Sequence, residues 1–511
     1  MAPARPEFTK PTAAVAGEGQ IGPDIIVADL QSVFRFGRVG DITAYAVGTN
    51  ACNLGDERAR WWARTRWHPL ISQAMYRLRN GRFEQIGMSW VKHGFYAVSE
   101  SLCGPCYDPT DGSELGVGCS DPYSARLNGV QANMSRRSDV NAHTGFFPYP
   151  PIWGEWQEVI DKRLQVHDAD LNPDWNTGAL YFVQGHYVAA DDSLAGNNNN
   201  SVCYRRVIVT EPSENEYEIN VTDQAQRGQP AIRAWQDTDP SVVETDVQVP
   251  GEGLFILAAK ATSLGLGFWQ YEYAVENLNS DRSCGSVSVL LPDGIIVGGI
   301  AFHDVDYHSG EIYDLTDWPA TVVDGEITWA TTSYDENPYA NALRWGTLYN
   351  FRFQTDISPG ATTVTLGLFK PGQPTQVRVR TIGPEGGLID CNGNGVADAC
   401  DIDCDAYGCE APCGLSADCN SNSVPDECDT ASGVSEDLDD NGVPDECELP
   451  GTGDFDADRD VDLEDFKQLM GLCFDGPAIP SDFPCHVADF DGDGDVDLLD
   501  FAEFLKAFTV P

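Results

Sequence analysis

Two short acidic segments near the C-terminal end of the 511-residue chain carry the side chains best suited to binding a metal ion. Segments 454–465 and 489–500 share one pattern, with carboxylates at loop positions 1, 3, 5, 7, 9 and 12. This spacing can surround Ca²⁺ with hard oxygen ligands, and the ion would offset the repulsion between the carboxylates. The predicted calcium ligands are Asp454, Asp456, Asp458, Asp460, Asp462 and Asp465 in the first copy and Asp489, Asp491, Asp493, Asp495, Asp497 and Asp500 in the second.

Apolar residues at helical spacing follow each acidic segment, so we expect a small all-α domain at 453–511. The pair of loops resembles a type I dockerin, a duplicated calcium-loop module that docks into a cohesin, and the resemblance implies a cohesin-like partner. Arg459 stands where a turn glycine is usual, whereas the second loop has Gly494, so the first loop should bind Ca²⁺ more weakly. A solvated acidic tail is the alternative interpretation.

A second repeat array occupies 388–449, where segments 390–401, 418–429 and 437–448 share a pattern of Asp, Asn and Cys. Leu438 replaces the first Cys in the third copy. Because the array has almost no apolar residues, it cannot bury a core, and calcium and disulfides must hold it instead. The array resembles thrombospondin type 3 repeats, which wind around Ca²⁺ as a semi-rigid stalk; a flexible acidic linker is the alternative. The resemblance implies the ligands Asp390, Asn392, Asn394, Asp398, Asp418, Asn420, Asn422, Asp426, Asp437, Asp439, Asn441 and Asp445.

The charge of the chain narrows the range of partners. The formal net charge is −49, and the part from Asp390 onward holds 33 of the 80 acidic residues but 3 of the 31 basic ones. A surface of this sign repels nucleic-acid phosphates and anionic membranes, so we expect neither as a partner. The sequence has no run of 18 apolar residues, and we therefore predict no membrane span.

The cysteines indicate the compartment. Six lie before residue 285, eight lie between Cys391 and Cys447, and two lie in the dockerin-like end. Even groups suit closed disulfides and an oxidising environment. We therefore expect an extracellular or cell-surface protein, although residues 1–22, which we interpret as a flexible leader, lack the features of a signal peptide.

Residues 23–385 contain all twelve tryptophans and predict a β-rich head. Asn80-Gly81 and Asp324-Gly325 each separate two strand-like segments, which indicates β-hairpins. Regular alternation of aromatic and polar residues marks further strands at 269–275 and 349–354. We predict one or two β-sandwiches, with a division near 212–220 as an option; 61–78 and 155–164 are the best candidates for short helices.

Three groups of residues in the head could carry chemistry. The motif Cys103-Gly-Pro-Cys106 has thioredoxin-like spacing, but a turn follows it instead of the helix that lowers a catalytic thiol pKa. We therefore favour structural disulfides, for which Cys52 and Cys119 offer other partners.

The cluster 303–308, with Glu311 and Asp314 beyond it, is the densest group of candidate transition-metal ligands in the head. Ordinary hydrogen-bonded residues in a surface loop are the favoured interpretation, because His303 and Asp306 would point to opposite faces of a strand. The third group, the carboxylates at 155 and 158, lies among tryptophans that could stack on sugars, and a helix face explains it equally well.

These observations favour an exported, calcium-binding protein with a non-catalytic binding, adhesive or structural head. The alternative is a polysaccharide-degrading enzyme of glycoside hydrolase type, or a carbohydrate-binding accessory protein, assembled through the dockerin-like end. Self-assembly through exposed edge strands is a third option. Segments 118–123 and 341–353 resemble exported proteins of planctomycete-type bacteria, a resemblance that carries no activity over.

Overall fold

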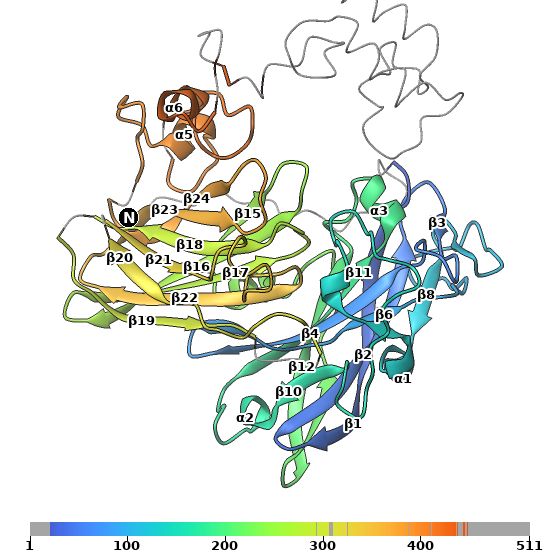
Figure 1. Ribbon diagram of the computed structural model, residues 1–511. Helices are drawn as coiled ribbons and strands as arrows, with labels where there is room; N and C mark the ends of the chain where they lie inside the picture. The colour runs from blue at the N-terminus through green and yellow to red at the C-terminus, as the bar shows by residue number, and fades with distance from the viewer. Residues whose placement is uncertain are drawn as a thin grey trace, which may run out of the picture. The chain divides into compact units, whose positions relative to one another are not determined.

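The computed structural model describes the head and part of the repeat array (Figure 1). It divides into two compact units, one running to Ile389 and including Asp405–Cys409, the other beginning at Asp390 and continuing after that insertion. The leader at 1–20 and the dockerin-like segment 453–511, with its twelve candidate ligands, lie outside the described residues. The described residues are 21–292, 294–305, 310–323, 325–386, 388–409, 411–435, 437, 443–444 and 447.

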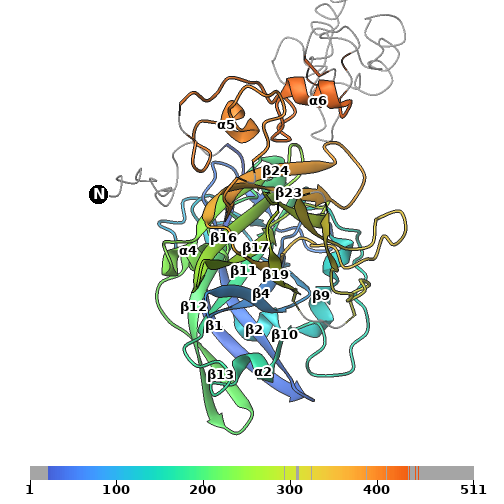
Figure 2. The ribbon, with the colours of Figure 1, turned by 90° about the vertical axis from the view of Figure 1, so that its left-hand side faces the viewer.

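The first part of the head is a 12-stranded antiparallel sheet. Its main path is β1 (Ile25–Val39), β2 (Ile42–Asn53), β10 (Leu164–His167), β5 (Arg82–Met88), β4 (Leu70–Arg79), β11 (Leu180–Val188), β12 (Val202–Ser213) and β13 (Glu216–Val221). Strands β6 (Val91–His93), β8 (Ser120–Tyr123), β9 (Met134–Ser135) and β14 (Gln226–Arg227) pair beside this path. The sheet curls towards a barrel, because β1 packs against β12 and β13 at the other end of the path (Figure 2).

The turn between β4 and β5 confirms one of the predicted hairpins. Arg79 pairs with Arg82, and the two residues between them, Asn80 and Gly81, have φ values of 53° and 77°. Positive φ at both central positions is the geometry that a two-residue turn needs to match the twist of its strands. The Asn-Gly pair therefore fixes the register of two neighbouring strands.

The second part of the head is a β-sandwich of two five-stranded antiparallel sheets. One contains β15 (Val243–Gln248), β16 (Leu254–Gly265), β17 (Phe268–Asn277), β22 (Thr347–Thr355) and β19 (Val297–His303). The other contains β20 (Ala320–Val323), β21 (Glu326–Ala330), β18 (Cys284–Leu290), β23 (Pro359–Leu368) and β24 (Gln376–Pro384). The aromatic face predicted for 269–275 and 349–354 points into this sandwich, where Tyr273, Phe351 and Trp329 are fully buried.

The polar face of β17 is buried as well, because strands of the first sheet cover it. Glu272 accepts a hydrogen bond from Arg82 Nε on β5 (2.7 Å), and Glu276 accepts one from Gln184 Nε2 on β11 (3.2 Å). Burial raises the pKa of both carboxyl groups to about 7. The aromatic side chains of β17 therefore face the interior of the sandwich, and its polar side chains face the buried contact with the 12-stranded sheet.

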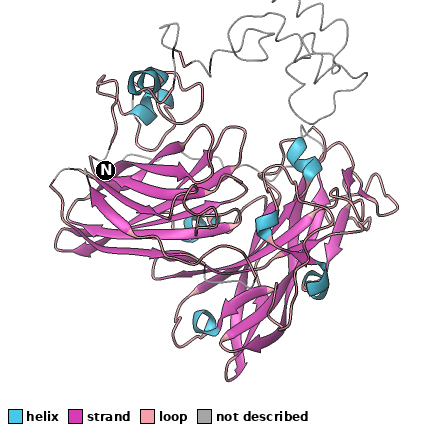
Figure 3. Cartoon of the chain, in the orientation of Figure 1, coloured by secondary structure: helices cyan, strands magenta, loops and turns pink. Residues whose placement is uncertain are grey.

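Among the described residues, helices are few and short (Figure 3). They are α1 (Ala125–Asn128), α2 (Asp168–Leu171), α3 (Ala190–Leu194), α4 (Arg233–Thr238), α5 (Asp398–Ile402) and α6 (Asp426–Ser432), with 3₁₀ turns at Gln131–Asn133 and Arg137–Asp139; a small ribbon pairs β3 (Ala59–Arg60) with β7 (Glu114–Leu115). The helix predictions at 61–78 and 155–164 are wrong. The first contains most of β4, whose residues are buried on both faces, so its apolar residues show no two-residue period.

The segment 212–220 does not divide the head. It lies in the hairpin of β12 and β13, where Ser213 pairs with Glu216. The chain leaves the 12-stranded sheet after β14 and reaches the sandwich at β15, with α4 between them. The head thus contains one sandwich and one strongly curled sheet.

Two disulfides stabilise the loops of the first sheet, Cys52–Cys103 and Cys106–Cys119. Cys103 and Cys106 of the C-x-x-C motif therefore do not pair with each other. The structural disulfides with Cys52 and Cys119 agree with the prediction made from the turn that follows the motif. The expectation that all six cysteines of the head pair is wrong, because Cys203 on β12 and Cys284 on β18 are buried free thiols. They lie on strands of different sheets, in separate cores.

We expect Cys203 and Cys284 to resist alkylation in the folded protein and to react after unfolding without reductant. Burial raises the pKa of Cys284 to about 12 and that of Cys203 further still, so neither forms the reactive thiolate at neutral pH. The four disulfide-bonded cysteines of the head should react only after a reductant has been added. Peptide mass mapping checks both statements, and labelling of either thiol in the native protein would contradict them.

Candidate metal centre

The side chains at positions 1, 3 and 5 of the first repeat fold back onto their own loop. Asp390 accepts hydrogen bonds from the backbone N–H groups of Asn394 (3.1 Å) and Gly395 (2.9 Å). Asn392 Oδ1 accepts from Asn394 N (3.1 Å), and Asn394 Oδ1 accepts from Val396 N (2.7 Å). Each of these oxygens keeps a further lone pair, so the loop presents several oxygen donors together.

Position 12 of this loop is Asp401, a residue that the sequence interpretation missed. Its side chain is 0% exposed, and its Oδ2 accepts hydrogen bonds from Asn392 Nδ2 (3.1 Å) and Asn394 Nδ2 (2.6 Å). Its Oδ1 is buried without a hydrogen-bond partner. A buried carboxylate oxygen without a donor is costly, and a cation is one means of compensating it. The signal was available, because position 12 completes the same loop spacing that we recognised at 454–465.

The second repeat reproduces the first. Asp418 accepts from Asn422 N (3.0 Å) and Ser423 N (2.9 Å), as Asp390 does in the first loop. The amides of Asn420 and Asn422 donate to Asp429 Oδ2 at 3.2 and 2.8 Å, and Asp429 is 1% exposed. Burial and then the neighbouring carboxylates raise the pKa of Asp418 to about 6. Two copies with the same contacts indicate that the repeat sequence encodes this geometry.

The position-9 carboxylates lie beside cysteines. Asp398 Oδ1 accepts from Cys391 N (2.8 Å), and Asp426 Oδ1 accepts from Cys419 N (2.9 Å). Two groups, Cys391–Asp398–Cys428 and Cys419–Asp426–Cys447, bring their ligand atoms within 4.8 Å and could hold a metal ion. In the oxidised protein these sulfur atoms are bonded to each other, so carboxylate and amide oxygens are the donors that remain. Such donors suit a hard cation rather than a thiophilic one.

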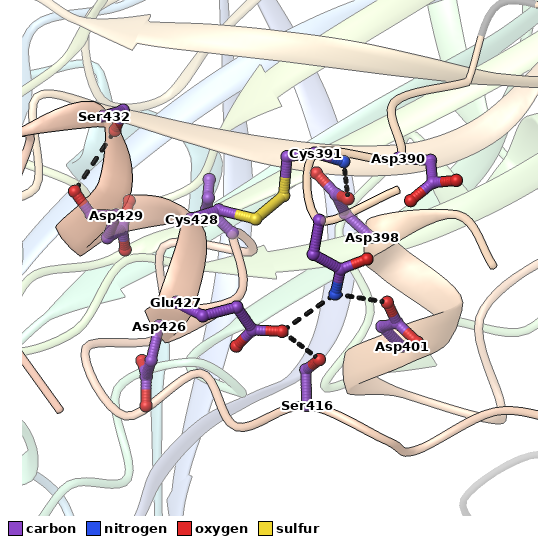
Figure 4. Close-up of a disulfide and its surroundings, with 12 residues drawn as sticks. Asp390, Cys391, Asp398, Asp401, Ser416, Asp426, Glu427, Cys428, Asp429 and Ser432 are labelled. Atoms are coloured by element: carbon purple, nitrogen blue, oxygen red, sulfur yellow. Dashed lines mark hydrogen bonds between the residues drawn. A yellow bond between two sulfur atoms is a disulfide. The ribbon is translucent and has the colours of Figure 1, made fainter. Parts of the chain in front are cut away.

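Disulfides connect each repeat to the next (Figure 4). Cys391 at position 2 of the first repeat bonds to Cys428 at position 11 of the second, and Cys419 at position 2 of the second bonds to Cys447 at position 11 of the third. Leu438 stands at position 2 of the third repeat, which no fourth copy follows. The prediction that all eight cysteines of this block pair is confirmed, with Cys404–Cys413, Cys400 and Cys409 also disulfide-bonded.

The described part of the third repeat is too small to test its ligands. Asp437 is described, whereas Asp439, Asn441 and Asp445 lie outside the described residues. Those ligands remain predictions, as do the ones in the dockerin-like loops.

The predicted cluster at 303–308 does not converge on one point in its described part. Asp304 accepts from Asn341 Nδ2 (2.5 Å), and Glu311 accepts from the backbone N–H groups of Arg137 and Ser138 at 2.8 and 3.3 Å. His303 Nε2 lies 4.0 Å from Glu84 Oε1, on another strand. Asp306 and His308 lie outside the described residues. Asp304 and Glu311 have separate hydrogen-bond partners, as the hydrogen-bonded interpretation expects, whereas His303 Nε2 has none.

A buried chain of Ser135, His93 and His68 was not foreseen. His93 Nε2 lies 2.8 Å from Ser135 Oγ, and His93 Nδ1 lies 2.6 Å from His68 Nε2. The order resembles a nucleophile, a base and an orienting group, but Ser135 is 2% exposed. Burial lowers the pKa of His68 to about 4, so the pair is neutral and serves as a hydrogen-bonded core. Their spacing in sequence gave no signal of this contact.

A cavity of about 60 Å³ in the head is lined by Arg137, Glu311, Arg344 and Trp345, among others. Glu155 and Glu158 are exposed on an irregular segment, so they form no facing pair of carboxylates within a helix. Among the described residues, no helix is long and apolar enough to cross a membrane.

Comparison with known proteins places the chain in no family. No model of a known family matches it, and no curated protein matches it. Among solved structures, it is similar to the N-terminal domain of a Streptococcus gordonii adhesin, at 8% sequence identity over 71% of this chain and 98% of that chain, with a TM-score of 0.16. A TM-score this low supports no conclusion about fold or function.

Glycine at positions 4 and 6 should relieve strain in the second loop. Ser421 and Ser423 have φ values of 53° and 65°, whereas the first loop has Gly393 and Gly395 there. Because a left-handed conformation costs an L-residue about 1 kcal/mol, we expect Ser423→Gly to slow hydrogen exchange at 418–429 by about fivefold. The reverse change, Gly395→Ser, should accelerate exchange at 390–401, since an added Cβ has open space there and acts through the backbone alone. If either variant showed the same hydrogen-exchange rate as the parent, the backbone at position 6 would not be strained by a side chain.

Proposed function

We propose that this chain is an exported, calcium-stabilised protein in which a β-rich binding head is carried on a stalk of calcium loops and docked through a dockerin-like end. The observation that carries the calcium assignment is the buried Asp401 carboxylate, whose Oδ1 has no hydrogen-bond donor, although its Oδ2 accepts from the amides of Asn392 and Asn394. A divalent cation would supply the missing positive charge. The repetition of these contacts around Asp429 supports the same assignment in the second loop.

The residues described in the stalk fit Ca²⁺ by chemistry. In the first loop Asp390, Asn392, Asn394 and Asp401 would hold the ion, with Asp398 beside them; in the second loop their counterparts are Asp418, Asn420, Asn422, Asp429 and Asp426. All are oxygen donors, and Ca²⁺ prefers six to eight of these. The bound ion would link the loop to the helix that follows it and so stiffen the stalk.

We expect chelation to loosen the stalk, with each loop responding to its own position-12 carboxylate. Asp401→Asn should raise the Ca²⁺ concentration that protects 390–401 from hydrogen exchange by about tenfold, and Asp429→Asn should do so for 418–429. Each variant is the control for the other. Exchange in the stalk that does not change on adding Ca²⁺ to the chelated full-length protein would refute the calcium assignment.

The dockerin-like segment is assigned from sequence alone, and its partner is proposed to be a cohesin-like protein. We expect chelation to unfold 453–511, and Asp489→Ala to reduce Ca²⁺ binding there more than Asp454→Ala, because the first loop lacks the turn glycine. Calorimetry of the full-length variants measures this difference. Equal losses from the two substitutions would contradict the ranking of the loops.

For the head we propose a non-catalytic binding, adhesive or structural role at the cell surface or in its surroundings. Both parts of the head are built around extensive buried apolar cores, which supports a structural or binding role. Tryptophans 62, 156 and 175 are exposed and offer stacking surfaces to a polysaccharide ligand.

A glycan array combined with a polysaccharide hydrolysis screen on the full-length protein separates the two alternatives. We expect retention of glycans, or no interaction, without release of reducing sugar. Sugar release that persists in highly purified protein would overturn the non-catalytic role and favour the enzyme.

A further inference from the structure

The contact between the first two repeats goes beyond their disulfide. Glu427 belongs to the second repeat, yet its Oε1 accepts a hydrogen bond from Asn392 Nδ2 of the first loop at 2.8 Å. The same Oε1 accepts from Ser416 Oγ at 2.6 Å (Figure 4). Ser416 is itself held to the first loop, since its backbone N–H donates to the Asp401 carbonyl at 3.0 Å.

The disulfide sets this contact. Cys391 and Asn392 are adjacent, as are Glu427 and Cys428, so the Cys391–Cys428 bond carries Glu427 directly to Asn392. Glu427 is exposed, and its Oε1 accepts the hydrogen bonds from both Asn392 and Ser416. A carboxylate in this place is an acceptor without a proton to donate.

Two acceptors together hold the orientation of the Asn392 amide, because Nδ2 donates to Glu427 Oε1 at 2.8 Å and to Asp401 Oδ2 at 3.1 Å. Oδ1 then faces the loop, where it accepts from Asn394 N and keeps a lone pair for an ion. Outer groups that orient a ligand in this manner typically change metal affinity by 10- to 100-fold.

We propose that Glu427 is a positioning residue for the first calcium loop, so that this loop is completed by the repeat that follows it. This inference rests on the calcium assignment proposed above. The sequence carries the same rule: position 10 is Ala399 in the first repeat, which follows no other loop, and Glu427 and Glu446 in the second and third. Glutamate thus occurs at position 10 where a preceding loop exists to receive it.

The test uses the full-length protein, depleted of metal and titrated with Ca²⁺, with hydrogen exchange read separately at 390–401 and 418–429. Glu427→Ala should raise the Ca²⁺ concentration that protects the first loop by about tenfold. It should leave the second loop, to which Glu427 itself belongs, within about twofold of the parent. Glu427→Gln keeps an acceptor oxygen at the same reach and should restore most of the affinity.

Two controls make the outcome unambiguous. Glu385→Gln removes one charge from an exposed residue of the head and should change neither loop. Ala399→Glu adds a position-10 carboxylate where no preceding loop exists, and it too should leave the midpoint of the second loop unchanged.

Three results would overturn the inference while leaving calcium binding intact: an unchanged first loop in Glu427→Ala, an equal shift of both loops, or a loss in Glu427→Gln as large as that in Glu427→Ala. If the parent protein shows no Ca²⁺-dependent protection in either loop, the calcium assignment fails instead. Ca²⁺-dependent protection in the parent protein therefore shows which of the two proposals has failed.

Discussion

The stalk depends on one constraint: it must hold buried carboxylates in place with almost no apolar core. Among its described residues the buried apolar side chains are Val424, Pro425 and Pro444, beside Cys400 and Cys428. Covalent bonds between repeats and hydrogen bonds from backbone N–H groups to Asp390 and Asp418 replace hydrophobic packing there. The acidic composition follows from this arrangement, because each loop needs several oxygens and each oxygen needs a donor or a cation.

The head solves the opposite problem: it has large apolar cores, and ion pairs compensate some of the charged side chains that it buries. Arg82 lies between the curled sheet and the sandwich, donating to Glu84 at 2.9 Å and to Glu272 at 2.7 Å. Arg77 donates to Glu84 at 2.7 Å from the neighbouring strand. Removing one member of such a set would leave the others buried without compensation, so this network favours one mutual arrangement of the two parts.

The sequence was informative where local chemistry decides the structure. The Asn80-Gly81 turn, the alternation along β17 and the evenly paired cysteines of the stalk could be predicted, because turn geometry, side-chain period and redox chemistry act over a few residues. Strand β4 could not, since burial on both faces removes the period that distinguishes a strand from a helix. The free thiols Cys203 and Cys284, the histidine pair and the reach of Glu427 depend on which segments meet in space, which spacing does not encode.

The disulfides of the stalk interleave along the chain. Cys419 lies between Cys391 and its partner Cys428 in the sequence, and Cys428 lies between Cys419 and its partner Cys447. A chain that emerges N-terminal end first therefore cannot close the crosslink that begins at position 2 of a repeat until the next repeat has also emerged. Cys391 and Cys419 are both open during this interval, and oxidation must not join them to each other.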